Sequence, residues 1–278
     1  MRSSVELFSL DSGETTVVHR TDRLVEAPNW TPDGAALIIN GDGRMFRIDL
    51  AAPDTLQEID TGFATGCNND HGLSPDGGML AISDRTETGK SCIYMLPAGG
   101  GAPRRITKNV PSWWHGWSPD GQEIAYAAVR GDDRFGIWAC PAAGGEERMV
   151  IGGDGPHYDG PDYTQDGEWI WFNSDRGGAM QLWRVRVDGT GAQQMTHDDR
   201  VNWFPHPSPD GRHVLYLAYP AGTTGHPRDL DVELRLIELP TGSNRTALSL
   251  FGGQGTINVP CWSPDGHRFA FVRYFPTT

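Results

Sequence analysis

Four of the nine histidines lie at comparable places along the chain, a few residues before four copies of a short turn-forming sequence. An imidazole can transfer protons near neutral pH, and its free ring nitrogen can bind a divalent metal. A neighbouring carboxylate supplies a partner for acid–base chemistry. The candidate metal ligands are His71, His115, His157 and His206, and the candidate catalytic residues are His115, His157, His206 and Asp159. The metal would be Zn²⁺ or Mn²⁺; the alternative for each single histidine is a packing or hydrogen-bonding role.

The residues around these histidines favour a small polar ligand such as a carbohydrate. Aromatic faces stack against the C–H groups of a sugar, and amide, carboxylate and guanidinium groups form hydrogen bonds to its polar groups. The alternative for the aromatic residues is that many of them fill gaps between structural elements. The predicted ligand-binding residues are Asn69, Asp70, His71, Trp113, Trp114, His115, His157, Tyr158, Asp159, Asn202, Trp203, His206, His226, Arg228 and Asn258.

Two arginines occur in a repeated Ser-Asp-Arg sequence, in which Arg85 follows Asp84 and Arg176 follows Asp175. A guanidinium group can bind a carboxylate through two parallel hydrogen bonds. For these two arginines we expect an ion pair with the neighbouring aspartate rather than contact with a ligand.

The elements that position these residues are marked by a tetrapeptide that recurs six times, at 31–34, 74–77, 118–121, 164–167, 208–211 and 263–266. The common form is Ser/Thr-Pro-Asp-Gly, and only Gln165 departs from it at the proline position. Proline presets the first turn residue, and glycine accepts the left-handed conformation that follows. The hydroxyl of Ser or Thr can accept hydrogen bonds from nearby backbone amides. Each copy therefore predicts a tight β-hairpin.

The segments flanking each hairpin also repeat. A strand precedes the turn, an apolar strand such as 79–82 follows it, and a third strand and a short fourth strand such as 104–107 complete the unit. A unit of roughly 44 residues built in this way is typical of one propeller blade. The chain ends supply 5–10 and 16–19, which would join 269–274 in a shared blade. The sequence thus predicts an all-β, six-bladed β-propeller of four-stranded antiparallel blades, as a single domain over 1–278.

The Trp-Ser-Pro-Asp-Gly unit, followed by an apolar strand and Ser-Asp-Arg at 83–85 and 174–176, resembles the WD40-like (PD40) repeat of the TolB family. The resemblance covers essentially the whole chain. It implies a TolB-like binding module that recognises a ligand or a protein partner at the channel mouth. The chain is also loosely similar to oligogalacturonate lyase propellers, whose His-rich channel mouth holds a metal. That similarity implies the alternative, a carbohydrate-active enzyme of the uronate lyase kind that uses the histidine cluster and is either metal-dependent or metal-free.

Composition narrows the partners and the compartment. The net charge is −13, which disfavours nucleic acid, and no apolar run is long enough for a membrane helix. The four cysteines form no CxxC pair and are expected to be reduced thiols. The N-terminal segment does not read as a signal peptide, so we expect a cytoplasmic protein, or a periplasmic one if a leader has been removed.

In this topology the hairpin turns lie on one face of the propeller. The loops before each first strand lie on the other face, around the mouth of the channel, and the histidines are expected there. The fifth unit exceeds the usual spacing, and the extra residues fall at 218–232. Insertions in repeat proteins gather on one face, often the binding face. We therefore expect this segment to form a lid over the channel mouth; the alternative is a surface loop without a role in binding.

Overall fold

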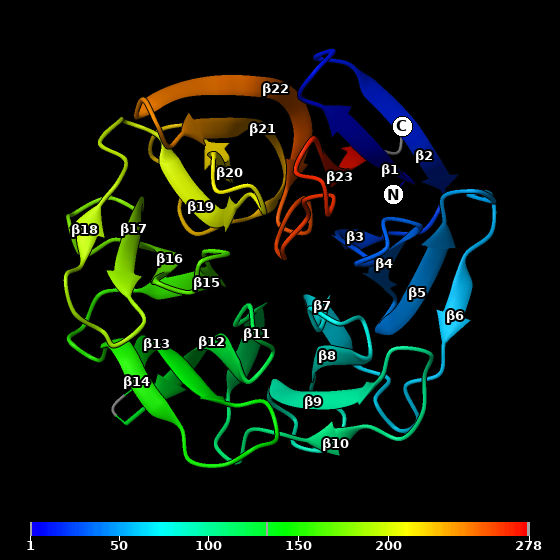
Figure 1. Cartoon of the computed structure of the whole chain (residues 1–278), viewed down its shortest axis with the longest axis horizontal. Helices are drawn as coiled ribbons and strands as arrows, with labels where there is room; N and C mark the ends of the chain where they lie inside the picture. Colours follow the sequence, from blue (N-terminus) through cyan, green and yellow to red (C-terminus); the bar gives the residue numbers. More distant parts are fainter. Residues whose placement is uncertain (1, 132, 277–278) are drawn as a thin grey trace.

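The computed structural model describes residues 2–131 and 133–276, and it is a six-bladed β-propeller whose sheets surround a central channel (Figure 1). Within these residues no helix is long and apolar enough to cross a membrane. Five sheets have four antiparallel strands that follow one another along the chain, and a sixth sheet joins the two chain ends. The predicted fold class is confirmed.

The strands are named blade by blade, from the channel outward in each consecutive blade. Blade 1 has β3 (Glu26–Trp30), β4 (Ala36–Gly41), β5 (Arg44–Asp49) and β6 (Gln57–Ile59); blade 2 has β7 (Cys67–Leu73), β8 (Met79–Asp84), β9 (Cys92–Pro97) and β10 (Arg104–Arg105); blade 3 has β11 (Ser112–Trp117), β12 (Glu123–Arg130), β13 (Arg134–Pro141) and β14 (Arg148–Gly152). Blade 4 has β15 (Tyr158–Tyr163), β16 (Trp169–Ser174), β17 (Gln181–Arg186) and β18 (Gln193–Gln194); blade 5 has β19 (Val201–Pro207), β20 (His213–Tyr219), β21 (Arg228–Glu238) and β22 (Ser243–Gly253); blade 6 has β23 (Arg268–Phe275), β1 (Arg2–Ser9) and β2 (Thr15–Thr21).

Blade 6 closes the ring as the sequence predicted, because β1 pairs with β23 in the order β2-β1-β23. Its innermost strand is reduced to a single bridge between Trp262 and Phe269. Arg273 and Glu6 tie the two chain ends together through an ion pair at 3.0 Å. This pairing covers the edges that β1 and β23 would otherwise expose to another chain.

The hairpin turns are stabilised by a repeated hydrogen-bond pattern. In blade 2 the Ser74 hydroxyl donates to Asp76 at 2.6 Å and accepts from the Met79 amide at 3.0 Å, and Asp76 also accepts from the Gly78 amide. The other five turns repeat the contact between the hydroxyl and the aspartate. These hydrogen bonds lower the pKa of the turn aspartates, including Asp76. The six turns gather on one face of the ring, where turn residues of neighbouring blades approach one another, as Gly77 and Pro32 do.

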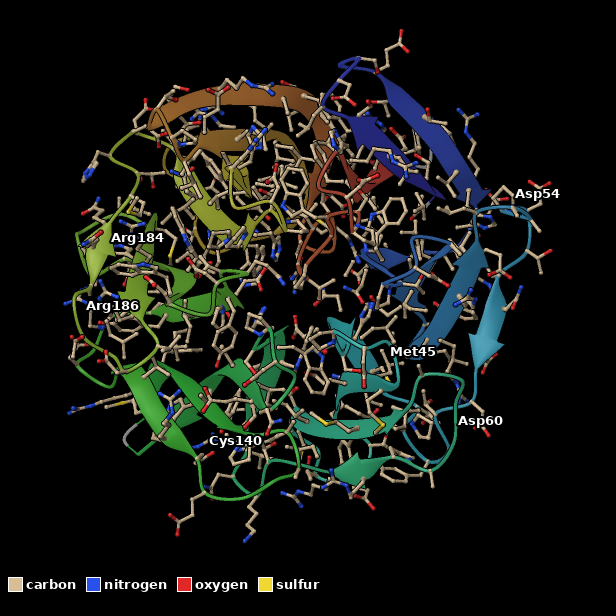
Figure 2. All side chains as sticks on the ribbon, viewed as in Figure 1. Met45, Asp54, Asp60, Cys140, Arg184 and Arg186 are labelled. Atoms are coloured by element: carbon tan, nitrogen blue, oxygen red, sulfur yellow. The ribbon has the colours of Figure 1, made fainter. Side chains whose placement is uncertain are left out.

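Most of the core lies between neighbouring blades. Every residue of β4 is buried, because both faces of an inner strand are covered. Met45 and Cys140 are buried inside the ring, whereas Asp54 and Arg186 project from its outer rim (Figure 2). All four cysteines are free, as the sequence predicted, and the structure shows that they are also buried.

The fourth strands are shorter than the sequence suggested, since β10 and β18 each span two residues. Blade 5 shows the opposite change. Its outer strands β21 and β22 are 11 residues long each, so the additional residues of this unit extend a hairpin as well as a loop.

Candidate functional site

The inner strands of blades 1 to 5 are interrupted at the same level, close to the channel mouth opposite the hairpin turns. A bulge bends the strand and re-aims its side chains. In blades 1 and 5 the bulge places non-glycine residues in the left-handed region, Ala27 at φ 55° and Phe204 at φ 53°, and in blade 4 Gly160 takes φ 61°. A bulky residue in this region is unusual and often marks a functional site. The shifts of register lie at 26–29, 67–71, 114–116, 159–162 and 203–206.

Asp159 is the centre of a cluster of three histidines from three blades. Nε2 of His115 lies 3.1 Å from Oδ1 of Asp159, and Nε2 of His157 lies 3.5 Å from its Oδ2. Nε2 of His226 lies 4.0 Å from the same Oδ2. Burial raises the pKa of Asp159, but its contacts with His115 and His157 outweigh that effect and hold this pKa well below its usual value. Asp159 is therefore ionised at neutral pH.

The two buried imidazoles of the cluster respond differently to this carboxylate. Burial lowers the pKa of His115, but Asp159 and Asp70 outweigh the burial, and the net shift is upward. His226 has a lowered pKa, because burial outweighs the attraction of Asp159. The cluster therefore favours the protonated form of His115 and the neutral form of His226, relative to a free imidazole.

Asp70 faces the same cavity from blade 2, but its pKa is shifted in the direction opposite to that of Asp159. Burial is the main cause that raises the pKa of Asp70 to about 7, and the nearby charge of Asp159 adds to the effect. The Asn68 amide donates to Oδ2 of Asp70 at 2.6 Å and holds the carboxyl in place. Two carboxyl groups of one cavity thus differ widely in proton affinity, as acid and base partners do.

These groups line a cavity of about 240 Å³ that opens at the channel mouth. One wall is aromatic: Trp113 stacks on Phe135 with ring centroids 6.3 Å apart, and Phe135 contacts the His157 ring at 4.1 Å. Polar and apolar groups therefore share the space, as in sites for small polar ligands. The lining residues are Asn68, Asp70, Trp113, His115, Phe135, His157, Asp159, Phe204, His226, Gln254 and Asn258.

The loop at 220–227 brings His226 to the cavity. The His226 ring lies 4.3 Å from the Trp203 ring and 5.3 Å from the Phe204 ring, centroid to centroid. The predicted insertion thus contributes one side chain to the site, while its later residues from 228 on belong to β21. A closing motion of this loop remains a prediction.

Several predicted site residues do not line this cavity. His206 lies deeper in the channel wall, where both ring nitrogens are engaged: Nδ1 with Asp162 at 3.0 Å and Nε2 with the Ile257 carbonyl at 2.6 Å. His71 is fully buried beside the Ile38 carbonyl, and burial lowers its pKa to about 4. The structure therefore separates His71 and His206 from His115 and His157.

Four of the other predicted residues outside the cavity pack in the core or form hydrogen bonds to side chains away from the cavity. Trp114 and Trp203 are core residues, Tyr158 donates to Asp154, and Asn202 donates to Gln181 and Asp198. Those without a place in the cavity lining are Asn69, His71, Trp114, Tyr158, Asn202, Trp203, His206 and Arg228.

Of the cavity lining, sequence reasoning missed Phe135 and Gln254. It also missed Glu26, which does not line the cavity but whose charge acts on Asp70. Phe135 is in the third strand of its blade and Gln254 follows the last strand of blade 5, outside the window in which the histidines recur. Glu26 does stand in that window. Burial raises its pKa, and Arg228 lies 4.0 Å from its carboxylate. The available signal was its place five residues before the turn, which in the other blades is held by Asn69, Trp113, Asp159, Trp203 and Asn258.

The metal prediction depends on convergence of ring nitrogens. Within 2–131 and 133–276, no group of three or more His, Cys, Asp or Glu side chains has the arrangement of a metal site. His115, His157 and His226 do come together, but their Nε2 atoms surround the Asp159 carboxylate. The expected set of His71, His115, His157 and His206 does not converge, because His71 and His206 lie apart from the Asp159 cluster, and a bound Zn²⁺ or Mn²⁺ stays a prediction.

The repeated blades, the ring closure and the polar channel mouth define a β-propeller of the TolB type. A family described as the TolB β-propeller domain (PD40) matches residues 111–233. A protein of Agrobacterium fabrum (strain C58), described as uncharacterized, is 52% identical over 276 residues, which cover 99% of this chain and 94% of that protein. The chain belongs to the TolB-like β-propeller family.

Solved structures agree with this assignment. The structure of a protein assigned as TolB from Agrobacterium tumefaciens has a TM-score of 0.97 and 52% identity, and the match covers 100% of this chain and 99% of that one. TolB from Acinetobacter baumannii has a TM-score of 0.70 at 16% identity over 91% of this chain and 64% of that one. An oligogalacturonate lyase in complex with manganese has a TM-score of 0.58 at 15% identity, over 88% of this chain and 72% of the lyase. The last two share the fold alone.

Proposed function

We propose that this propeller binds a small polar molecule of the carbohydrate kind at the channel mouth. The observation that carries the proposal is the convergence of Asp70, His115, Asp159 and His226 from four blades on one cavity of about 240 Å³. Charged groups buried at this level are costly to the fold unless they are paired or used by a ligand. A ligand rich in hydroxyl groups would donate to Asp159 and accept from His115, and Trp113 would cover one of its faces.

The second candidate is an enzyme that acts on such a molecule. It is favoured by the opposite pKa shifts of Asp70 and Asp159, which provide a proton donor and a proton acceptor in one cavity near neutral pH. A lyase or hydrolase needs such a pair. Conversion of a bound sugar or uronate, followed by chromatography of the products, separates this candidate from simple binding.

The proposed binding is tested by thermal-shift measurements with neutral sugars and sugar acids. We expect at least one compound to raise the melting temperature of the unmodified protein, and Asp159→Asn and His115→Ala to remove that rise. His267→Ala is the matched control, because His267 is exposed on the face of the hairpin turns. A protein partner whose capture survives both site substitutions, with no shift from any sugar, would overturn the proposal.

For the compartment, only the state of the cysteines provides an argument. Four buried reduced cysteines agree with a cytoplasmic location, which stays a proposal.

A further inference from the structure

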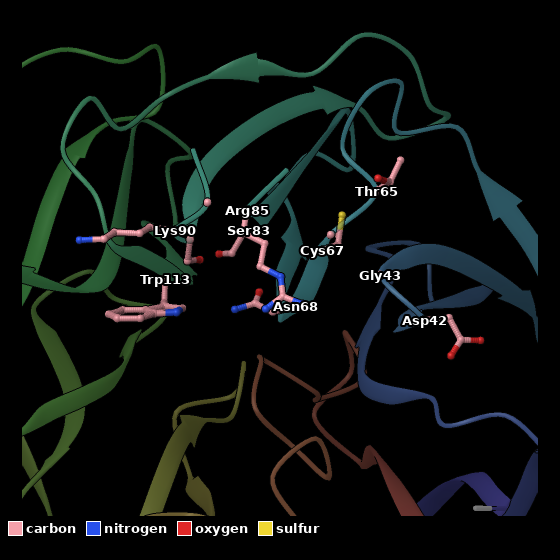
Figure 3. A pocket seen from close by; sticks show the side chains of 12 residues that line it. Asp42, Gly43, Thr65, Cys67, Asn68, Ser83, Arg85, Lys90 and Trp113 are labelled. Atoms are coloured by element: carbon pink, nitrogen blue, oxygen red, sulfur yellow. The ribbon is translucent and has the colours of Figure 1, made fainter. Parts of the chain in front are cut away.

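A second and larger cavity, of about 530 Å³, adjoins the first on the same face. It is built from the loops of blades 1 and 2 and from Trp113 of blade 3 (Figure 3). Two cationic side chains line it, Arg85 and Lys90, and one acidic side chain, Asp42. In Figure 3 Asp42 lies on the far side of the cavity from Arg85, near Gly43.

Arg85 was expected to pair with Asp84, and this expectation is wrong. Asp84 is buried and accepts instead from the Gly66 amide at 2.7 Å, the Thr86 amide at 2.7 Å and the Thr86 hydroxyl at 3.1 Å. Among the residues that the structure describes, no carboxylate lies within ion-pair distance of Arg85 or Lys90. The cavity therefore has two cations whose charge is not offset by a direct partner.

The corresponding arginine of blade 4 shows that this arrangement is not a property of the repeat. Arg176 also follows Ser-Asp, but its guanidinium lies over the Trp183 ring, 5.0 Å from the centroid. Its neighbour Asp175 accepts from the His157 amide at 2.8 Å. Arg85 thus differs from its repeat equivalent, whose guanidinium packs over an aromatic ring.

The two cavities meet at shared residues. Asn68 and Trp113 line both of them, and Figure 3 shows the Asn68 amide and the Arg85 guanidinium on the same side of the larger cavity. Asn68 is also the residue that donates to Asp70 in the smaller cavity. A ligand that occupies the smaller cavity can therefore continue past Asn68 and Trp113 towards Arg85.

We propose that the larger cavity is an oxyanion subsite, in which Arg85 binds the carboxylate or phosphate group of an elongated ligand. This inference rests on the proposed function, because the polar remainder of the ligand would lie against Asp159 and His115. A guanidinium offers parallel donors that match a carboxylate or phosphate. The Lys90 amine points away from Arg85 in Figure 3 and adds only to the positive charge of the cavity wall. The ionised Asp159 repels an anion from the smaller cavity, so the two cavities together fix the direction in which the ligand binds.

The experiment uses calorimetric titration at constant ionic strength, because surface charge pairs are sensitive to salt. The probes are D-glucose, D-glucuronate and D-glucose 6-phosphate, which differ in the anionic group. We expect Arg85→Met to weaken binding of one or both anionic probes at least tenfold and to leave binding of glucose within twofold. The anionic probe that is affected distinguishes a carboxylate ligand from a phosphate ligand. Arg176→Met, the matched control, should leave all three affinities unchanged.

A second measurement tests the subsite apart from the smaller cavity. Inorganic phosphate and acetate are titrated while the Arg85 Nε–H resonance is followed by NMR, in the unmodified chain and in Asp159→Asn. A saturable shift in both proteins, without sugar binding, would support the subsite and reject the proposed function. Sugar binding with equal loss of glucose and glucuronate in Arg85→Met, or no response of the Arg85 resonance to either anion, would overturn the subsite. A melting curve of Arg85→Met confirms that the variant is folded.

Discussion

Nε2 of His115, on β11 of blade 3, lies 3.1 Å from Oδ1 of Asp159, on β15 of blade 4. This pair joins two neighbouring blades at the point where both inner strands are bulged. It raises the pKa of His115 against the effect of burial and lowers that of Asp159. The same contact therefore joins blades 3 and 4 and shifts the pKa values of two groups in the cavity.

The first prediction follows from this pair. In Asp159→Asn the pKa of His115 should fall, because the carboxylate that favours the imidazolium is lost while the burial remains. An NMR titration of the imidazole Cε1–H signal, assigned with His115→Ala, measures the change. An unchanged titration midpoint for His115 would contradict the assigned role of Asp159.

Asp70 should limit the stability of the fold above neutral pH. Its folded pKa is raised to about 7, so between roughly pH 4 and 7 the folded protein keeps a proton that the unfolded chain releases. Stability attributable to this group therefore falls as the pH rises through that window. Asp70→Asn should increase the free energy of unfolding at pH 8 by about 1–3 kcal/mol and change it little at pH 4.

Urea denaturation at the two pH values checks the Asp70 prediction. The exposed Asp54→Asn serves as control, because Asp54 projects from the outer rim (Figure 2). The same Asp70→Asn variant should bind ligand more weakly. A stability gain of equal size at pH 4 and pH 8 would show that the gain does not come from the charge of Asp70.

His226 should contribute to binding through its imidazole and to stability through its ring. His226→Ala is expected to weaken ligand affinity about tenfold, the size of one or two lost hydrogen bonds. His226→Phe should restore the packing against Trp203 but not the affinity. Calorimetry and thermal melting separate the two effects, with Thr224→Ala in the same loop as control. Full affinity in His226→Phe would indicate that the loop acts only by covering the cavity.

His206 should be important for folding rather than for binding. Removing the ring leaves Asp162 and the Ile257 carbonyl without their partner, and breaking such a buried pair costs about 3–5 kcal/mol. His206→Ala should therefore lower stability by this amount. At a temperature where the variant is folded, its ligand affinity and its content of any bound Zn or Mn should equal those of the unmodified chain. Loss of a stoichiometric metal from this variant, measured by elemental analysis, would return His206 to the candidate ligands.

The fold could be predicted from the sequence because its determinants are local and repeated. Each Ser/Thr-Pro-Asp-Gly turn carries its own hydrogen bonds, as Ser74 and Asp76 show, and six copies specify the blade number. Turn chemistry of this kind is readable from four residues. Ring closure through β1 and β23 could be predicted because the last repeat has only its first strands, and the N-terminal segment supplies the strands that complete the blade.

The site could be predicted only in part, because its composition depends on contacts between blades. His71 and His115 occupy the same repeat position, yet His115 reaches the cavity and His71 is buried beside the Ile38 carbonyl. His206, one residue nearer its turn, contacts Asp162 within the channel wall. A shift of one residue along a strand reverses the direction of a side chain, and the bulges introduce such shifts. The Asp84–Arg85 ion pair was predicted wrongly for another reason, because the Gly66 amide, distant in the sequence, donates to the Asp84 carboxylate.

The central claim, ligand binding at the channel mouth, is tested most directly by calorimetric titration of neutral sugars and sugar acids into the unmodified chain, Asp159→Asn and His267→Ala. Saturable binding of at least one compound to the unmodified chain and to His267→Ala, with at least tenfold weaker binding to Asp159→Asn, is the predicted result. Equal affinity in all three proteins, or no binding of any compound to the unmodified chain, would contradict the account.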